Sequence, residues 1–158
     1  MEEKKFKKIL DPHHALIKAQ KYCVYQERSQ QEVRDKLYSF GLHRKEVESL
    51  IAELITSGFL KEERFAHAFA GGKFRMKGWG RIKIKLALKQ KDVSEVLIKQ
   101  ALKAIDERDY IKELKKVISE KEKKTSEKNP LKKKYKVAQY AISRGFEPEL
   151  VWAIINEA

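Results

Sequence analysis

The feature that most constrains this chain is an apolar pattern that occurs three times. Moving the sequence along itself by 51 positions matches six apolar residues of the first copy with other apolar residues. The matched pairs are Val33 and Ile84, Leu37 and Leu88, Leu42 and Val93, Val47 and Ile98, Ile51 and Leu102, and Leu54 and Ile105. A shift of 104 positions matches Val33, Leu37, Gly41, Leu42, Val47, Leu50 and Ile51 with Val137, Ala141, Gly145, Phe146, Val151, Ile154 and Ile155. A unit repeated in this way packs against its neighbours, because one copy cannot bury its apolar face alone.

Within each copy, apolar residues three or four positions apart predict helices. In the first copy Asp11 and Pro12 mark one helix start, and a capping box from Ser29 to Glu32 marks the second. Gly41 ends that second helix, and a third follows. We therefore predict an all-α chain of three tandem three-helix, helix-turn-helix-like repeats that form an elongated, curved array. The expected parts are a lead-in at 1–11 and repeats at 12–57, 58–106 and 107–158.

One short stretch argues against helix. Polar and apolar residues alternate from Arg81 to Leu86, which taken alone favours a strand. The repeat instead predicts a helix here, with Ile84 and Leu88 on the common apolar stripe and Ile82 and Leu86 on a second apolar edge.

The second and third copies also differ from the first. Asp92 stands where the other copies have glycine, and aspartate can adopt the left-handed turn conformation. In the third copy we expect a first helix over about residues 109–121 and a polar loop near 119–131.

The composition excludes several classes of function. The formal net charge of +13 indicates an anionic partner, most simply nucleic acid or an assembly that contains it. A single cysteine, Cys23, excludes an intrachain disulfide, and its place on an apolar stripe favours a core thiol. The four histidines, His13, His14, His43 and His67, show no metal-binding spacing. We expect no catalytic residue, no cofactor and no metal.

The N-terminal sequence lacks an apolar run typical of a signal peptide, and no stretch approaches a membrane span. We therefore expect a cytoplasmic protein without a membrane partner.

Basic residues mark the candidate binding surface. They gather in the middle copy and at the second helix of the third copy. The first group comprises Lys73, Arg75, Lys77, Arg81, Lys83, Lys85 and Lys89, with Trp79 among them; the second comprises Lys132, Lys133, Lys134 and Lys136. Arg81, Lys85 and Lys89 are four apart and share one helix face, which could follow a run of phosphates or an acidic groove. For any single lysine, a solvated helix face is the simpler interpretation.

The two tryptophans have different expected roles. Trp79 could plug the junction between repeats, or it could offer a stacking face to a base or a partner side chain. Trp152, beside Val151 on the last helix, is expected in the core.

A family resemblance adds to this interpretation. The segment Gly58-Phe59-Leu60 followed by Glu63-Arg64-Phe65-Ala66 resembles the signature of the RecX family of recombination regulators. The similarity continues through Ser29 to Gly41, Lys77 to Gly80, Ile84 with Leu88, and Arg144-Gly145-Phe146, and it covers residues 15–158. Lys61-Glu62 replaces the usual pair of aspartates, which weakens a functional role for that acidic pair. The family-motif residues Phe59, Leu60, Glu63, Arg64, Phe65, Gly145 and Phe146 are expected to be structural.

The resemblance implies a non-enzymatic protein of tandem three-helix repeats. It implies binding to the RecA filament on single-stranded DNA, in the helical groove, with restraint of its ATPase and strand exchange in recombination, DNA repair and the SOS response. A monomer is the simplest form for a protein that inserts into a groove.

Two alternatives stay open. One is a DNA- or RNA-binding helical module that acts without RecA, since the three-helix unit resembles a helix-turn-helix domain. The other is an unrelated helical scaffold with an acidic protein partner.

Overall fold

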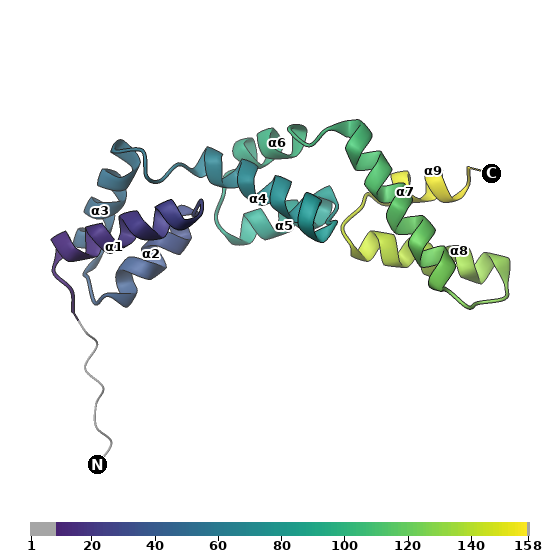
Figure 1. Ribbon diagram of the computed structural model, residues 1–158, viewed down its shortest axis with the longest axis horizontal. Helices are drawn as coiled ribbons and strands as arrows, with labels where there is room; N and C mark the ends of the chain where they lie inside the picture. Colours follow the sequence, from purple (N-terminus) through teal and green to yellow (C-terminus); the bar gives the residue numbers. More distant parts are fainter. Residues whose placement is uncertain (1–8, 158) are drawn as a thin grey trace, which may run out of the picture. The chain divides into compact units, whose positions relative to one another are not determined.

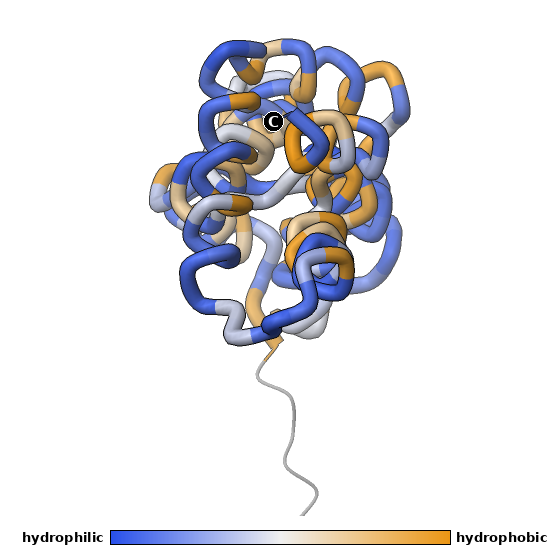
Figure 2. Tube along the Cα trace, turned by 90° about the vertical axis from the view of Figure 1, so that its right-hand side faces the viewer, coloured by the Kyte–Doolittle hydropathy of each residue, from blue (hydrophilic) through white to orange (hydrophobic). Residues whose placement is uncertain are grey.

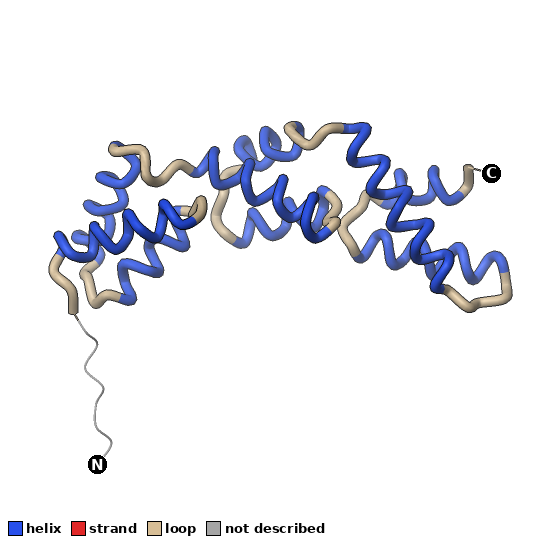
Figure 3. Tube along the Cα trace, in the orientation of Figure 1, coloured by secondary structure: helices blue, strands red, loops and turns tan. Residues whose placement is uncertain are grey.

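The computed structural model describes residues 9–157, and all regular secondary structure in that range is helical (Figures 1 and 3). In chain order the helices are α1 (Pro12–Tyr25), α2 (Gln30–Ser39), α3 (Arg44–Thr56), α4 (Glu62–Lys77), α5 (Arg81–Gln90), α6 (Glu95–Lys103), α7 (Glu107–Lys124), α8 (Pro130–Ser143) and α9 (Pro148–Ile155). The all-α prediction is confirmed. Most of the lead-in expected at 1–11 lies outside the described residues.

Short polar side chains begin several of these helices. Asp11 accepts a hydrogen bond from the backbone N–H of His14 at 2.9 Å, and Ser29 accepts one from the backbone N–H of Glu32 at 3.1 Å. Both starts are where the sequence predicts them. Ser94, Asp106 and Asn129 cap α6, α7 and α8 in the same way. Each cap satisfies an amide that has no partner within its own helix.

The turn that follows the second helix has the same backbone conformation in all three copies. Gly41 has φ of 86°, Asp92 has φ of 59° and Gly145 has φ of 99°. Asp92 is the sole described residue other than glycine with positive φ. The prediction that this aspartate adopts the left-handed conformation is confirmed.

The segment from Arg81 to Leu88 is helical, so the prediction from the repeat holds over the local alternation. Ile84 and Leu88, four positions apart, are fully buried in α5. Ile82 and Leu86 lie on another side of this helix and are 48% and 58% exposed. Burial of one stripe determines the secondary structure here, since packing of an amphipathic face stabilises a helix more than a short local pattern does.

The described contacts group the chain into two compact units. Among the described residues, the first contains 9–66 together with 91–93, and the second contains 67–90 and 94–157. In the first unit, α1, α2 and α3 close over an apolar core that includes Ala15, Cys23, Leu37 and Leu54. Cys23 is buried there, as expected of a core thiol, and burial raises the pKa of its thiol.

In the second unit, α7, α8 and α9 pack together around Tyr110 and Phe146, whose ring centroids are 5.3 Å apart. Hydrophobic and hydrophilic residues occur within the same helical coils, as Figure 2 shows. Division of the chain into three repeats at 12–57, 58–106 and 107–158 stays a prediction, because these contacts define two units.

The polar tract of the third copy differs from its prediction. The helix expected over 109–121 continues to Lys124, and the loop expected near 119–131 is confined to residues 125–129. Lysine and glutamate form helices readily, and Val117 and Ile118 anchor this helix in the core. Polarity alone therefore overstated the length of the loop.

Candidate partner-binding surface

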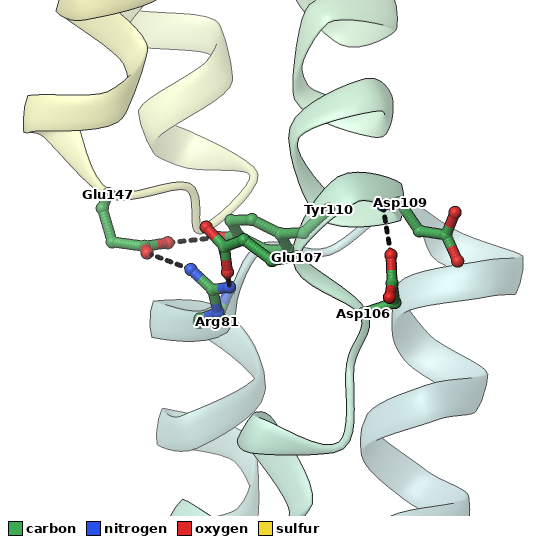
Figure 4. A network of polar contacts seen from close by, with 6 residues as sticks. All are labelled: Arg81, Asp106, Glu107, Asp109, Tyr110 and Glu147. Atoms are coloured by element: carbon green, nitrogen blue, oxygen red, sulfur yellow. Dashed lines mark hydrogen bonds and ion pairs between the residues drawn. The ribbon is translucent and has the colours of Figure 1, made fainter.

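Arg81 is held inside the second unit by three neighbours (Figure 4). One guanidinium nitrogen is 2.8 Å from a carboxylate oxygen of Glu147, and the other end of the group pairs with Glu107. The guanidinium carbon lies 3.7 Å from the centroid of the Tyr110 ring. Burial opposes the charge of Arg81, but the hydrogen bonds to Glu147 and Glu107 outweigh it and raise the pKa. This side chain joins α5, α7 and the start of α9.

Tyr110 completes the same network. Its hydroxyl accepts a hydrogen bond from the backbone N–H of Arg81 at 3.1 Å and donates one to Glu147. The residue is fully buried, and burial raises the pKa of its hydroxyl above the ordinary value. Asp106 stands beside the network as the N-cap of α7, where it accepts from the backbone N–H of Asp109 (Figure 4). Spacing on one helix placed Arg81 among the partner-binding candidates, whereas its contacts show a structural ion pair.

The backbone forms a second connection at the same place. The N–H of Gly80 donates to the carbonyl of Arg144 at 2.8 Å, and the N–H of Ile82 donates to the carbonyl of Gly145 at 3.0 Å. The start of α5 thereby pairs with the turn between α8 and α9. A β-carbon on Gly80 would lie 2.3 Å from the carbonyl carbon of Gly145, so only glycine allows this approach.

Trp79 lies under two of the predicted basic residues. The ammonium groups of Lys73 and Lys83 are 5.0 and 4.6 Å from its ring centroid. The tryptophan is half-buried, and it follows Gly78, which turns with φ of 64°. Both cation–π contacts hold cations close to the indole, so Trp79 organises positive charge within the unit.

The remaining central candidates have more solvent around them. Arg75, Lys77, Lys85 and Lys89 are all exposed. The ammonium of Lys89 is 3.6 Å from a carboxylate oxygen of Glu95, a solvent-exposed pair of small energetic value. The guanidinium of Arg75 lies back against Gly71 of its own helix, and Lys77 and Lys85 are the exposed lysines of this group that are in no ion pair among the described residues.

The second basic group lies on α8. Lys132, Lys134 and Lys136 border a hollow of about 640 Å³. Its apolar lining comes from Leu131, Tyr135 and Trp152, and Asn156 adds a polar group. Lys133 is half-buried beside them. Trp152 is half-buried and faces the Tyr135 ring at 6.1 Å between centroids, so the expectation of a core tryptophan is wrong.

The sequence did not single out this hollow. Its signal is Leu131 and Tyr135, two apolar residues four positions apart within a lysine-rich stretch. In a helix such a pair shares one face, which distinguishes it from the random interruption of a basic tract.

The family-motif residues are mainly core residues or make contacts that hold turns in place. Leu60, Phe65 and Phe146 are buried, Phe59 is half-buried and Glu63 is exposed. Arg64 pairs with Glu27 at 2.7 Å and donates to the carbonyl of Gly58 at 2.9 Å. Gly145 belongs to the backbone connection with α5.

Other kinds of site find no support in residues 9–157. Within that range no cluster of three or more histidine, cysteine or acidic side chains could hold a metal ion. Nor does any helix in the same range have the length and apolar character needed to cross a bilayer. The described surface is characterised by its basic residues and by the hollow on α8.

Comparison with known proteins gives a consistent result. The family models described as "RecX, second three-helix domain" and "RecX, third three-helix domain" match residues 62–102 and 107–155. Regulatory protein RecX of Thermotoga petrophila is 31% identical over 96% of this chain and 88% of its own length. Its counterpart from Thermotoga maritima is 32% identical with the same coverage. The crystal structure of RecX from Lactobacillus salivarius shares the fold, with a TM-score of 0.83 and 23% identity over 92% of this chain and 95% of that one.

Proposed function

Because this chain belongs to the RecX family of regulatory proteins, we propose that it binds filaments of the recombinase RecA on single-stranded DNA and restrains their ATPase and strand-exchange activities. RecX proteins are regulators and not enzymes. The observation that carries the proposal is similarity to RecX proteins along 96% of the chain. We further propose that it occupies the helical groove of the filament as a monomer.

The charge of the chain supports this partner. A net charge of +13 suits a filament whose DNA supplies a dense line of phosphates. Lys77 and Lys85 are exposed, whereas Arg81 is committed to Glu107 and Glu147. We therefore propose that the filament-binding surface comprises Trp79, the two lysines over its ring, Lys73 and Lys83, and the exposed Arg75, Lys77, Lys85 and Lys89. The lysines of α8 form a separate candidate surface.

A charge-reversal experiment tests the proposal. The double variant Lys77→Glu/Lys85→Glu should bind RecA-coated single-stranded DNA about tenfold more weakly, because each change replaces an attraction to an anionic partner with a repulsion. Lys21→Glu/Lys45→Glu is the matched control, since both lysines are exposed and the change in net charge is equal. Co-sedimentation measures binding, and ATP turnover by RecA measures the regulatory effect. Equal loss in both double variants would show a nonspecific charge effect and remove the central surface from the interface.

The same binding assay separates filament binding from direct binding to nucleic acid. We expect the wild-type chain to lower ATP turnover only when it is bound to the filament. If the chain binds naked single-stranded DNA as tightly as it binds the filament, with a steep dependence on salt, the module that acts without RecA is favoured. Binding to the filament with ATP turnover unchanged would contradict the inhibitory role.

A further inference from the structure

The hollow between α8 and α9 exposes several apolar side chains, although the start of α8 is rich in lysine. Leu131 is 77% exposed and Tyr135 is 59% exposed, while Trp152 of α9 closes the hollow from the other side. Its volume of about 640 Å³ falls within the range of pockets that bind small molecules, so several side chains of a peptide can enter it. Exposed aromatic and aliphatic groups gathered in one concave place indicate a binding site more often than isolated surface residues do.

Lysines stand on both sides of this apolar line. Successive residues of an α-helix are about 100° apart, so Leu131 and Tyr135 share one line along α8. On the same wheel Lys134 falls on one side of that line, and Lys132 and Lys136 fall on the other. All three lysines border the hollow. A ligand seated on Leu131 and Tyr135 would therefore meet positive charge along both of its edges.

The fold itself gains little from these cations. Lys132 lies in the first turn of α8, where the helix dipole disfavours positive charge. Lys136 pairs with Glu127 at 3.0 Å, and this hydrogen bond holds the pKa of the Glu127 carboxyl below its ordinary value. Within residues 9–157 neither Lys132 nor Lys134 has a carboxylate within ion-pair distance. Their charges remain available to a ligand.

We propose that this hollow binds a short acidic peptide segment of a protein partner, which places an apolar anchor on Leu131, Tyr135 and Trp152 and carboxylates beside the flanking lysines. The distribution of charge favours a peptide over a nucleic acid. A nucleic-acid strand carries phosphates along one edge and bases along the other, whereas the lysines here lie on both sides. The proposal concerns a second site and does not depend on RecA binding.

The test uses two defined peptides and the full chain. The probe is fluorescein-labelled Glu-Glu-Leu-Phe-Glu-Glu, and its partner Glu-Glu-Ser-Ser-Glu-Glu keeps the charge but lacks the anchor. Fluorescence anisotropy should show binding of the first peptide at least about tenfold tighter than the second, because apolar burial adds to electrostatic attraction. Equal affinity for both peptides would show attraction by charge alone and overturn the site.

Four single variants locate the binding. Leu131→Ser and Lys134→Glu should each weaken the probe about tenfold, through loss of apolar contact and of charge attraction. Leu86→Ser and Lys112→Glu make the same changes at exposed positions outside the hollow and should leave affinity within about twofold. Circular dichroism checks that all four variants fold, so that a loss of affinity can be assigned to the hollow. Equal affinities in each matched pair would overturn the proposal.

Two other occupants give distinct results. The first alternative is nucleic acid, tested with an oligothymidylate. If Leu131→Ser and Lys134→Glu both weaken binding of the oligothymidylate but leave binding of the peptide unchanged, the hollow binds nucleic acid. The second alternative is another copy of the chain, tested by analytical ultracentrifugation. If the chain self-associates, and Leu131→Ser abolishes the self-association without changing peptide affinity, the hollow binds a second copy. Either result would overturn the peptide proposal.

Discussion

Substitution of Gly80 by alanine tests the close backbone approach between α5 and the turn that joins α8 to α9. The new β-carbon would lie 2.3 Å from both the carbonyl carbon of Gly145 and the amide nitrogen of Phe146. Both atoms belong to the main chain, so the α8–α9 turn must move away. That movement would lengthen the hydrogen bonds from Gly80 to Arg144 and from Ile82 to Gly145, now 2.8 and 3.0 Å.

The expected cost follows from these two effects. Overpacking of a tight contact costs ~1–3 kcal/mol, and each weakened hydrogen bond costs up to ~1 kcal/mol. We therefore expect Gly80→Ala to lower the free energy of unfolding by about 3 kcal/mol. For a chain of this length, that corresponds to a fall in melting temperature of roughly 6–12 °C.

Gly72→Ala is the matched control and should have the opposite effect. Gly72 lies within α4, and a β-carbon built there meets no atom within 4 Å. Alanine in a helix interior is more stable than glycine by ~0.5–1 kcal/mol. Thermal and urea unfolding, followed by circular dichroism, measure both variants. If the melting temperature of Gly80→Ala equals that of Gly72→Ala, or exceeds that of the wild type, the close approach of α5 to the α8–α9 turn is refuted.

Three further substitutions test separate contacts. Tyr110→Phe removes a hydroxyl that bonds both Arg81 and Glu147, so urea unfolding should show a loss of ~1–3 kcal/mol. Because the pKa of Tyr110 is raised in the folded chain above its ordinary value of 10.0, the unfolded chain loses this proton first and stability falls as pH rises above 10.0; that part of the alkaline decline should be smaller in Tyr110→Phe. Asp92→Gly relieves a positive φ and should raise the free energy of unfolding in urea by about 0.5–1 kcal/mol; an unchanged or lower stability would contradict this reasoning. Ser29→Ala removes the buried cap of α2 and should cost ~1 kcal/mol in urea unfolding, with no change if that cap is not formed.

Most of the fold could be predicted from the sequence because the positions that stay apolar in every copy are mostly buried. Most of the matched apolar positions are buried, and Val33 with Ile84 and Leu37 with Leu88 are fully buried in both copies, whereas Leu102 and Ile154 are half-buried. Capping residues also act over three positions, so Ser29 could be identified locally. Where both kinds of signal agreed, the predicted helix was present.

The candidate site was less accessible because its contacts join distant parts of the chain. The partners of Arg81 are 26 and 66 positions away, and helical spacing with Lys85 and Lys89 carries no information about them. The hollow likewise needs α8 and α9 together, since Tyr135 and Trp152 acquire meaning only when their rings face each other. The sequence showed where the basic residues are concentrated. It could not show which of them form ion pairs within the protein and which are exposed and able to bind a partner.

The three equivalent turns show how one conformation can have different sequence requirements. Gly41, Asp92 and Gly145 all have positive φ, which glycine adopts most easily. At Gly145, however, a β-carbon would lie 2.4 Å from the β-carbon of Lys83 and 3.0 Å from the carbonyl oxygen of Gly80. Asp92 is exposed, so its side chain extends into solvent. Backbone conformation therefore makes glycine favourable in every copy, and the packing of α5 against the last turn makes it necessary in the third.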